Sequence, residues 1–100
     1  MFDLLIRNAQ VLDGTGAPAY LADVAVKDGK IAAVGKLSGE AAETADAAGL
    51  TLAPGFIDVH GHSDFFMPLD PARASKLLQG VTTELCGQCG LGPAPVTEHN

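Results

Sequence analysis

The sequence has 100 residues, of which 47% are hydrophobic and 18% are charged, and this composition excludes a disordered chain. One hundred residues suggest a single small domain or part of a larger one. Twelve acidic residues against six basic ones give a formal net charge of −6 without any run of Lys or Arg, which argues against a nucleic-acid or anionic-membrane surface.

The segment 1–7 lacks the basic start and the long apolar stretch of a signal peptide, so we expect no secretion signal. No apolar stretch approaches the length of a membrane span. Two cysteines are too few for a disulfide framework, and a reducing cytoplasm is therefore the expected compartment. The composition thus predicts no nucleic-acid partner and no membrane partner.

The first half of the chain is predicted to form short β-strands separated by turns. The expected strands are residues 3–7, 9–12, 22–27, 30–35 and 49–53. Asp28-Gly29 separates two of them and is typical of a tight β-hairpin. Residues 37–48 are rich in Ala and Glu without a helical stripe, so we expect a loop there, containing at most a short strand at 44–47.

The second half is predicted to form a strand, a helix and a strand. The first strand is expected from Phe56 to His62, after the Pro54-Gly55 break. Asp70-Pro71 is typical of a helix start, and Gly80 of a helix end. The helical stripe between them consists of Ala74, Leu77 and Leu78. The β-branched segment Val81–Cys86 follows as the second strand, and this βαβ order implies a parallel pair.

Two histidines one residue apart close the first of these strands. Side chains alternate in a strand, so Asp58, His60 and His62 are expected on one face, where both imidazoles can reach a single metal ion. Gly61 lets the backbone bend where the strand ends. A bare H-x-H is more often a pair of surface histidines. The carboxylates of Asp58 and Asp64 close to this pair favour metal ligation instead.

Cys86 and Cys89 form a C-x-x-C motif at the end of the second strand. A thioredoxin-like redox site is one interpretation, but such a site usually begins a helix, and the segment 90–93 contains two glycines and a proline. Two structural thiols are another interpretation, which suits Cys86 within the strand. Because the carboxyl ends of parallel strands share one edge, Cys89 could instead converge with His60 and His62 as a third metal ligand.

Several segments carry a family resemblance. Residues 53–62, A-P-G-F-I-D-V-H-G-H, resemble the first barrel strand of the amidohydrolase superfamily. Segments 5–9 and 26–35 resemble its N-terminal β-sandwich segment. Segments 80–84 and 87–90, G-V-T-T-E and G-Q-C-G, are similar to those of the N-acyl-D-amino-acid deacylases, or D-aminoacylases.

In that family a cysteine after the second strand joins the two strand-one histidines at zinc. The separation here, 89 − 62 = 27 residues, fits this arrangement. Gln88 stands where the family more often has Asn, and Cys86 stands where an aliphatic residue is usual. The resemblance therefore implies zinc as the cofactor, with His60, His62 and Cys89 as its ligands.

The resemblance also implies a mixed β and α/β fold. Residues 1–53 would form part of a small β-sandwich. Residues 54–100 would form the first strand, helix and second strand of a metal-dependent-hydrolase (β/α)8 barrel, which is incomplete in this chain. Asp58 and Asp64 would at most orient a ligand imidazole. No catalytic residue is expected in this segment, because in the family two further histidines and a catalytic aspartate come from later barrel strands.

The implied function is hydrolysis of the amide bond of N-acyl-D-amino acids, which are small-molecule substrates, by a zinc enzyme acting on non-peptide C–N bonds. We expect the isolated 100 residues to be inactive. A cyclic-amide hydrolase of the hydantoinase or dihydroorotase type explains the histidine pair equally well but leaves Cys89 without a role. A non-catalytic β-domain that binds metal or a partner is the other alternative, and open strand edges would let it self-associate.

Overall fold

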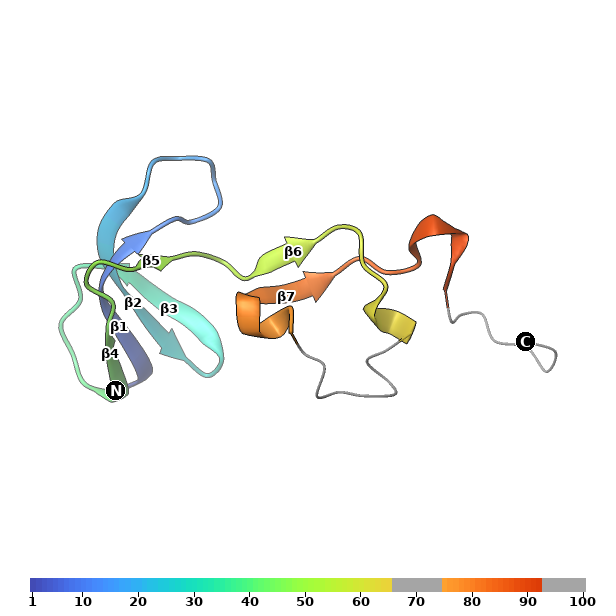
Figure 1. Ribbon diagram of the computed structural model, residues 1–100. Coiled ribbons are helices and arrows are strands. Elements are labelled where there is room, and N and C mark those ends of the chain that lie inside the picture. The colour runs from blue at the N-terminus through green and yellow to red at the C-terminus, as the bar shows by residue number, and fades with distance from the viewer. Residues whose placement is uncertain (66–74, 93–100) are drawn as a thin grey trace. The chain divides into compact units, whose positions relative to one another are not determined.

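β-Strands dominate residues 1–65 and 75–92, the part of the chain that the structure, a computed structural model, describes (Figure 1). The chain divides into two units, Met1–Pro54 and Gly55–Asn100. The expected abundance of β-strands is confirmed. No helix in the described ranges is long and apolar enough to cross a membrane.

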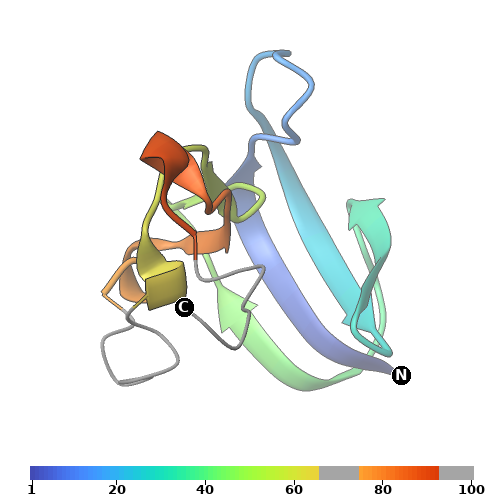
Figure 2. The same ribbon diagram turned by 90° about the vertical axis from the view of Figure 1, so that its right-hand side faces the viewer.

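β1 (Phe2–Val11) is a central strand of the five-stranded sheet in the first unit (Figure 2). It pairs antiparallel with β2 (Tyr20–Lys27) and parallel with two later strands. The remaining strands are β3 (Lys30–Gly35), β4 (Ala41–Asp46) and β5 (Thr51–Leu52). The strand order is β3-β2-β1-β4, with β5 pairing the end of β1, so β3 and β4 form the two edges of this path.

β1 is one continuous strand where the sequence predicted two segments, 3–7 and 9–12. Asn8 lies between them with a positive φ of 60°, and the pairing with β2 shifts register between Ile6 and Ala9. The strand therefore bulges instead of ending. The Asn8 N–H donates to Asp23 Oδ1 over 2.9 Å, so the bulge leaves this amide satisfied.

β2 and β3 form the predicted hairpin. Asp28 and Gly29 have φ values of 51° and 71°, the left-handed values that a tight hairpin turn requires. The Asp28 N–H donates to the Asp3 carboxylate over 2.6 Å. The turn residues identified in the sequence therefore set the register of this hairpin.

β4 shows that the expectation of a loop over 37–48 was wrong. The strand begins at Ala41 rather than 44 and continues to Asp46. Its Ala and Glu residues have weak intrinsic strand preference, so the local sequence carries little strand signal. Parallel pairing with β1, from Phe2↔Ala41 to Arg7↔Asp46, supplies the hydrogen bonds that stabilise it.

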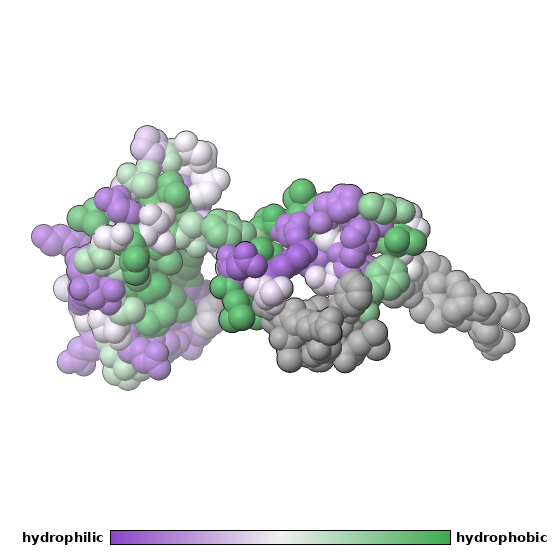
Figure 3. Space-filling model, in the orientation of Figure 1, coloured by the Kyte–Doolittle hydropathy of each residue, from purple (hydrophilic) through white to green (hydrophobic). Residues whose placement is uncertain are grey.

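The first unit has a thin core and an open apolar face. Its buried apolar side chains are Leu5, Ala9, Val11, Ala22, Val24, Ala25 and Ala47. Leu5 is the largest fully buried one. Ile31 and Val34 of β3 are 70% and 45% exposed, and with Tyr20 they help to line an apolar groove of about 300 Å³. Apolar side chains accordingly reach the surface of this unit (Figure 3).

The second unit contains the predicted parallel pair, formed by β6 (Phe56–Asp58) and β7 (Val81–Glu84). Both strands are shorter than expected. β6 ends at Asp58 rather than His62, because the Asp58 carboxylate accepts the His60 N–H and bends the chain out of the pleat. β7 ends at Glu84, so Cys86 lies beyond the strand and not within it.

Three short 3₁₀ helices complete the described part of the second unit: η1 (Ser63–Phe65), η2 (Leu77–Gln79) and η3 (Gln88–Gly90). The predicted helix start at Asp70-Pro71 and the stripe residue Ala74 lie outside the described residues. Leu77 and Leu78 fall in η2, which is one turn long. Gly80 ends it with a left-handed φ of 87°, as the sequence predicted.

Candidate metal centre

His60 and His62 follow β6 in a loop. The Asp58 Oδ1 atom accepts the His60 N–H over 3.1 Å, and the Gly61 N–H donates to the Leu85 carbonyl over 3.2 Å. These two bonds turn the backbone immediately after the strand. The imidazole centroids lie 5.5 Å apart with an interplanar angle of 73°. The histidines therefore come together, although through the loop and not through the pleat that the sequence suggested.

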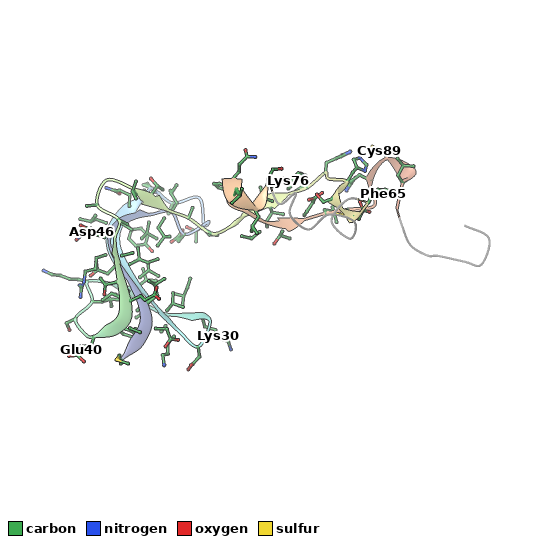
Figure 4. The ribbon with its side chains drawn as sticks, turned by 60° about the horizontal axis from the view of Figure 1, so that its bottom comes forward. Lys30, Glu40, Asp46, Phe65, Lys76 and Cys89 are labelled. Carbon is green, nitrogen blue, oxygen red and sulfur yellow. The ribbon has the colours of Figure 1, made fainter. Side chains whose placement is uncertain are left out.

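Cys89 lies in η3, beyond the end of β7 (Figure 4). Its φ of 58° is unusual for a residue with a side chain, and Gly87 and Gly90 on either side also have positive φ. The Gln88 side-chain amide donates to the Val59 carbonyl over 3.3 Å and ties this turn to the histidine loop. Cys89 Sγ consequently lies 3.2 Å from His60 Nε2.

Three donor atoms converge at this point. One ligand atom from each of His60, His62 and Cys89 lies within 4.8 Å of the other two. His62 is half-buried, whereas His60 and Cys89 are exposed. Zinc binds imidazole nitrogen and thiolate sulfur at about 2.0–2.3 Å, which places neighbouring ligand atoms of a tetrahedral site about 3.3–3.8 Å apart. The imidazole and thiol donors are of the kinds that zinc prefers, and the 3.2 Å between His60 Nε2 and Cys89 Sγ is close to this spacing.

Cys86 does not join this cluster of donor atoms. It is half-buried, and both thiols are free. No disulfide links the C-x-x-C motif, and its two cysteines differ in exposure and surroundings.

Asp58, expected to orient an imidazole, contacts the backbone of His60 instead. Its Oδ2 atom accepts a 2.5 Å hydrogen bond from Lys76 Nζ. The hydrogen bond from Lys76 is the largest cause that holds the pKa of Asp58 below its usual range, and the hydrogen bond from the His60 N–H is the next. The hydrogen bond to Asp58 in turn raises the pKa of Lys76. Asp58 is therefore ionised at neutral pH, and its carboxylate shapes the loop by accepting the main-chain N–H of His60.

Asp64, the other carboxylate expected near the histidines, lies in η1. Its Oδ1 atom is buried and has no hydrogen-bond partner within the described part of the chain. A buried carboxylate oxygen without a partner carries a desolvation cost. The absence of a bond from this atom to either imidazole in the described part of the chain gives no support to the expected role of Asp64 in orienting one.

Sequence reasoning missed three residues, Ser63, Lys76 and Glu84, that form a bonded group at the end of the histidine loop. Glu84 Oε1 accepts the Ser63 N–H over 3.0 Å, and Glu84 Oε2 accepts the Ser63 hydroxyl over 2.6 Å. Lys76 Nζ lies 3.3 Å from Glu84 Oε1. The Ser63 hydroxyl is the main cause that lowers the pKa of Glu84. In the sequence, Glu84 looks like an ordinary polar strand residue. Only its position opposite Asp58 in the parallel register could have indicated that its carboxylate lies near the histidine loop.

Two family models match the chain. Residues 43–97 match the model for the amidohydrolase family, and residues 1–54 match the model for the N-terminal domain of the urease alpha subunit. Each match covers more than half of the chain. The match to the amidohydrolase model includes His60, His62 and Cys89.

Similar proteins include several deacylases. D-aminoacylase from Alcaligenes xylosoxydans xylosoxydans is 43% identical over 99% of this chain and 21% of its own length. N-acyl-D-glutamate deacylase from Bordetella bronchiseptica, solved with zinc and a phosphonate inhibitor, is 46% identical with a TM-score of 0.88, over 95% of this chain and 20% of that one. A D-aminoacylase structure with a binuclear metal center is 44% identical with a TM-score of 0.91, over 100% of this chain and 21% of that one. The chain thus spans about a fifth of the length of these relatives.

Proposed function

The chain belongs to the amidohydrolase family, and from this premise we propose that it forms the N-terminal metal-binding segment of a zinc-dependent enzyme that hydrolyses N-acyl-D-amino acids. The observation that carries the proposal is the convergence of His60, His62 and Cys89 within 4.8 Å. The similarity to deacylases over nearly the whole chain supports the substrate class. Cys89 favours a deacylase over a cyclic-amide hydrolase, because the histidine pair alone leaves the thiol without a role.

We further propose that residues 1–53 are a partial β-sandwich domain and that residues 54–100 begin a (β/α)8 barrel, with β6 and β7 as its first two strands. The parallel pairing of β6 with β7 supports the barrel assignment, since parallel strands joined by a crossover are its repeating unit. A complete barrel takes about 250 residues, so these 100 residues can supply only part of one.

In this proposal the chain's own residues hold the metal. His60 and His62 each offer a neutral imidazole nitrogen, and Cys89 offers a thiolate. A zinc ion bound there would lower the pKa of a water ligand to about 7 and polarise the acyl carbonyl. The reaction would release a free D-amino acid and a carboxylate.

The residue that moves protons during hydrolysis is proposed to lie outside these 100 residues. The 100 residues alone should therefore not turn over substrate. Turnover of an N-acyl-D-amino acid by the pure chain, abolished by a chelator, would contradict this.

Two further aspects of the function stay proposals. A cytoplasmic location fits the two free thiols, which a reducing compartment would preserve. Self-association would use the exposed strand edges of the first unit, of which β3 carries the strongly exposed Ile31.

Zinc titration of the chain, followed by calorimetry, tests the proposed metal site. Cys89→Ser and His60→Ala should each weaken zinc binding by about 100-fold or more, because each removes one of the three proposed protein ligands. Cys86→Ser is the matched control and should bind zinc as the parent does. Equal affinity of Cys89→Ser and the parent would contradict the proposed ligand set, and a selective loss in Cys86→Ser would favour the other thiol.

A further inference from the structure

Two carboxylates lie side by side beneath the histidine loop. Asp58 ends β6, Glu84 ends β7, and the two residues are direct partners in the parallel register. Their side chains are only 28% and 15% exposed. Lys76 Nζ lies between them, 2.5 Å from Asp58 Oδ2 and 3.3 Å from Glu84 Oε1. One ammonium group thus offsets the repulsion between two neighbouring negative charges.

These carboxylates hold the histidine loop at both ends. Asp58 accepts the N–H of His60, the first histidine, over 3.1 Å. Glu84 accepts both the N–H and the hydroxyl of Ser63, which directly follows His62, over 3.0 and 2.6 Å. The loop that contains both imidazoles is therefore fixed to the ends of two different strands.

Gly61 shows how closely the loop lies on Glu84. A Cβ atom at this position would overlap the carboxylate of Glu84. Gly61 is buried, and its N–H donates to the carbonyl of Leu85, the residue that follows Glu84, over 3.2 Å. Only glycine leaves room for the Glu84 side chain in its bonded position.

We propose that Glu84, held in place by Lys76, is a positioning residue that preorganises the loop His60–Ser63 for metal binding. The proposal rests on the proposed function, because the metal is that of the same site. Glu84 bonds no donor atom of the three proposed ligands, so it acts through the backbone and hydroxyl of Ser63. A loop that is already ordered loses less conformational freedom when the metal binds, and the residues that orient ligands commonly contribute 10–100-fold in affinity.

The first test compares metal binding by full-chain variants. Glu84→Ala should weaken zinc binding about 10- to 100-fold, and Glu84→Gln less, because its carbonyl oxygen still accepts the Ser63 N–H. Ser63→Ala keeps that bond and loses the hydroxyl, so a loss of about 5-fold is expected. Glu43→Ala, which removes an exposed carboxylate from β4, is the control and should leave the affinity unchanged.

Cobalt gives a spectroscopic readout of the same inference. Cys89 is placed by the turn around Gln88, whose bond to Val59 does not involve Glu84. The Cys89 thiolate-to-cobalt absorption band should therefore persist in Glu84→Ala at saturating cobalt, while more cobalt is needed to reach it. Loss of the band at saturation would show that the whole site had collapsed and would contradict a role confined to the histidine loop.

A double-mutant cycle isolates the contact with Gly61. Gly61→Ala should weaken zinc binding about as much as Glu84→Ala, because the added methyl group displaces the carboxylate. In the Glu84→Ala background the overlapping atoms are gone, so the second substitution should add little. Fully additive losses would contradict the proposed contact.

A metal-free measurement separates this inference from the proposed function. Amide hydrogen exchange of Gly61 and Ser63 should accelerate in Glu84→Ala but not in Glu43→Ala. Unchanged exchange, or unchanged zinc affinity of Glu84→Ala beside a parent that binds zinc, would overturn the inference alone. A parent chain that binds no metal would overturn the proposed function and this role together.

Discussion

At the scale of single residues, Asp23 stabilises an irregular stretch of backbone. Its two carboxylate oxygens accept the N–H groups of Asn8 and Leu37 over 2.9 and 3.1 Å, and the Arg7 guanidinium lies 3.5 Å away. The Asn8 N–H first, and the Leu37 N–H second, hold the pKa of Asp23 below its usual 3.8. Because the folded-state pKa is the lower one, ionised Asp23 stabilises the fold above the unfolded value, and this contribution is lost as the pH falls through the folded value.

Asp23→Asn should therefore lower the Tm at pH 7, since the amide has only one acceptor oxygen for two backbone N–H groups. The difference in Tm from the parent should shrink as the pH falls from about 4 towards the lower pKa of Asp23 in the folded state. Thermal unfolding followed by circular dichroism between pH 3 and 7 measures both effects. Glu43→Gln, an isosteric change at an exposed position of β4, should not alter the Tm at either pH. Equal Tm values of Asp23→Asn and the parent at pH 7 would count against the role of Asp23.

At the scale of elements, the hairpin of β2 and β3 depends on its two-residue turn. Gly29 has a φ of 71°, and a Cβ atom there would meet no other atom within 4 Å. Gly29→Ala should thus lower the free energy of unfolding by about 1–2 kcal/mol through backbone strain alone. Gly29→Asn should cost less, because Asn tolerates the left-handed region. Urea unfolding gives both values, and the reverse order of the two variants would contradict this explanation.

Sequence patterns predict the elements that local residues decide, and they miss those that depend on distant contacts. The Asp28-Gly29 turn and the helix end at Gly80 are decided by local backbone chemistry, and both were predicted. β4 is decided by its pairing with β1, far away along the chain, so its own residues predicted a loop. In the candidate site, the convergence of Cys89 with the histidines follows from parallel strands ending at one edge. The bonds of Glu84 to Ser63 join residues 21 positions apart and have no local pattern.

At the scale of the whole molecule, the first unit exposes apolar side chains along an edge strand. Ile31 of β3 is 70% exposed, and unpaired strand edges are templates for pairing with another chain. We therefore expect the chain to elute from a size-exclusion column at larger apparent mass as its concentration rises. Ile31→Lys should reduce this shift, because a charge on an edge strand opposes edge-to-edge pairing.

Leu50→Lys is the matched control for this experiment. Leu50 is 63% exposed but lies outside the strands, so the same change of charge should leave the concentration dependence in place. A chain that stays monomeric at high concentration, or equal effects of the two lysine substitutions, would contradict association through the β3 edge.

The pairing of distant segments also sets the order in which the chain can fold. β2 and β3 meet across a two-residue turn, and such hairpins form within about 1–10 μs. β6 pairs with β7 only after a much longer loop has closed, from Phe56 to Val81, and this closure is slower. During synthesis on the ribosome, the histidines emerge well before Glu84 and Cys89. The loop that carries them acquires its shape only once β7 has arrived, so metal uptake should follow the earliest folding steps instead of guiding them.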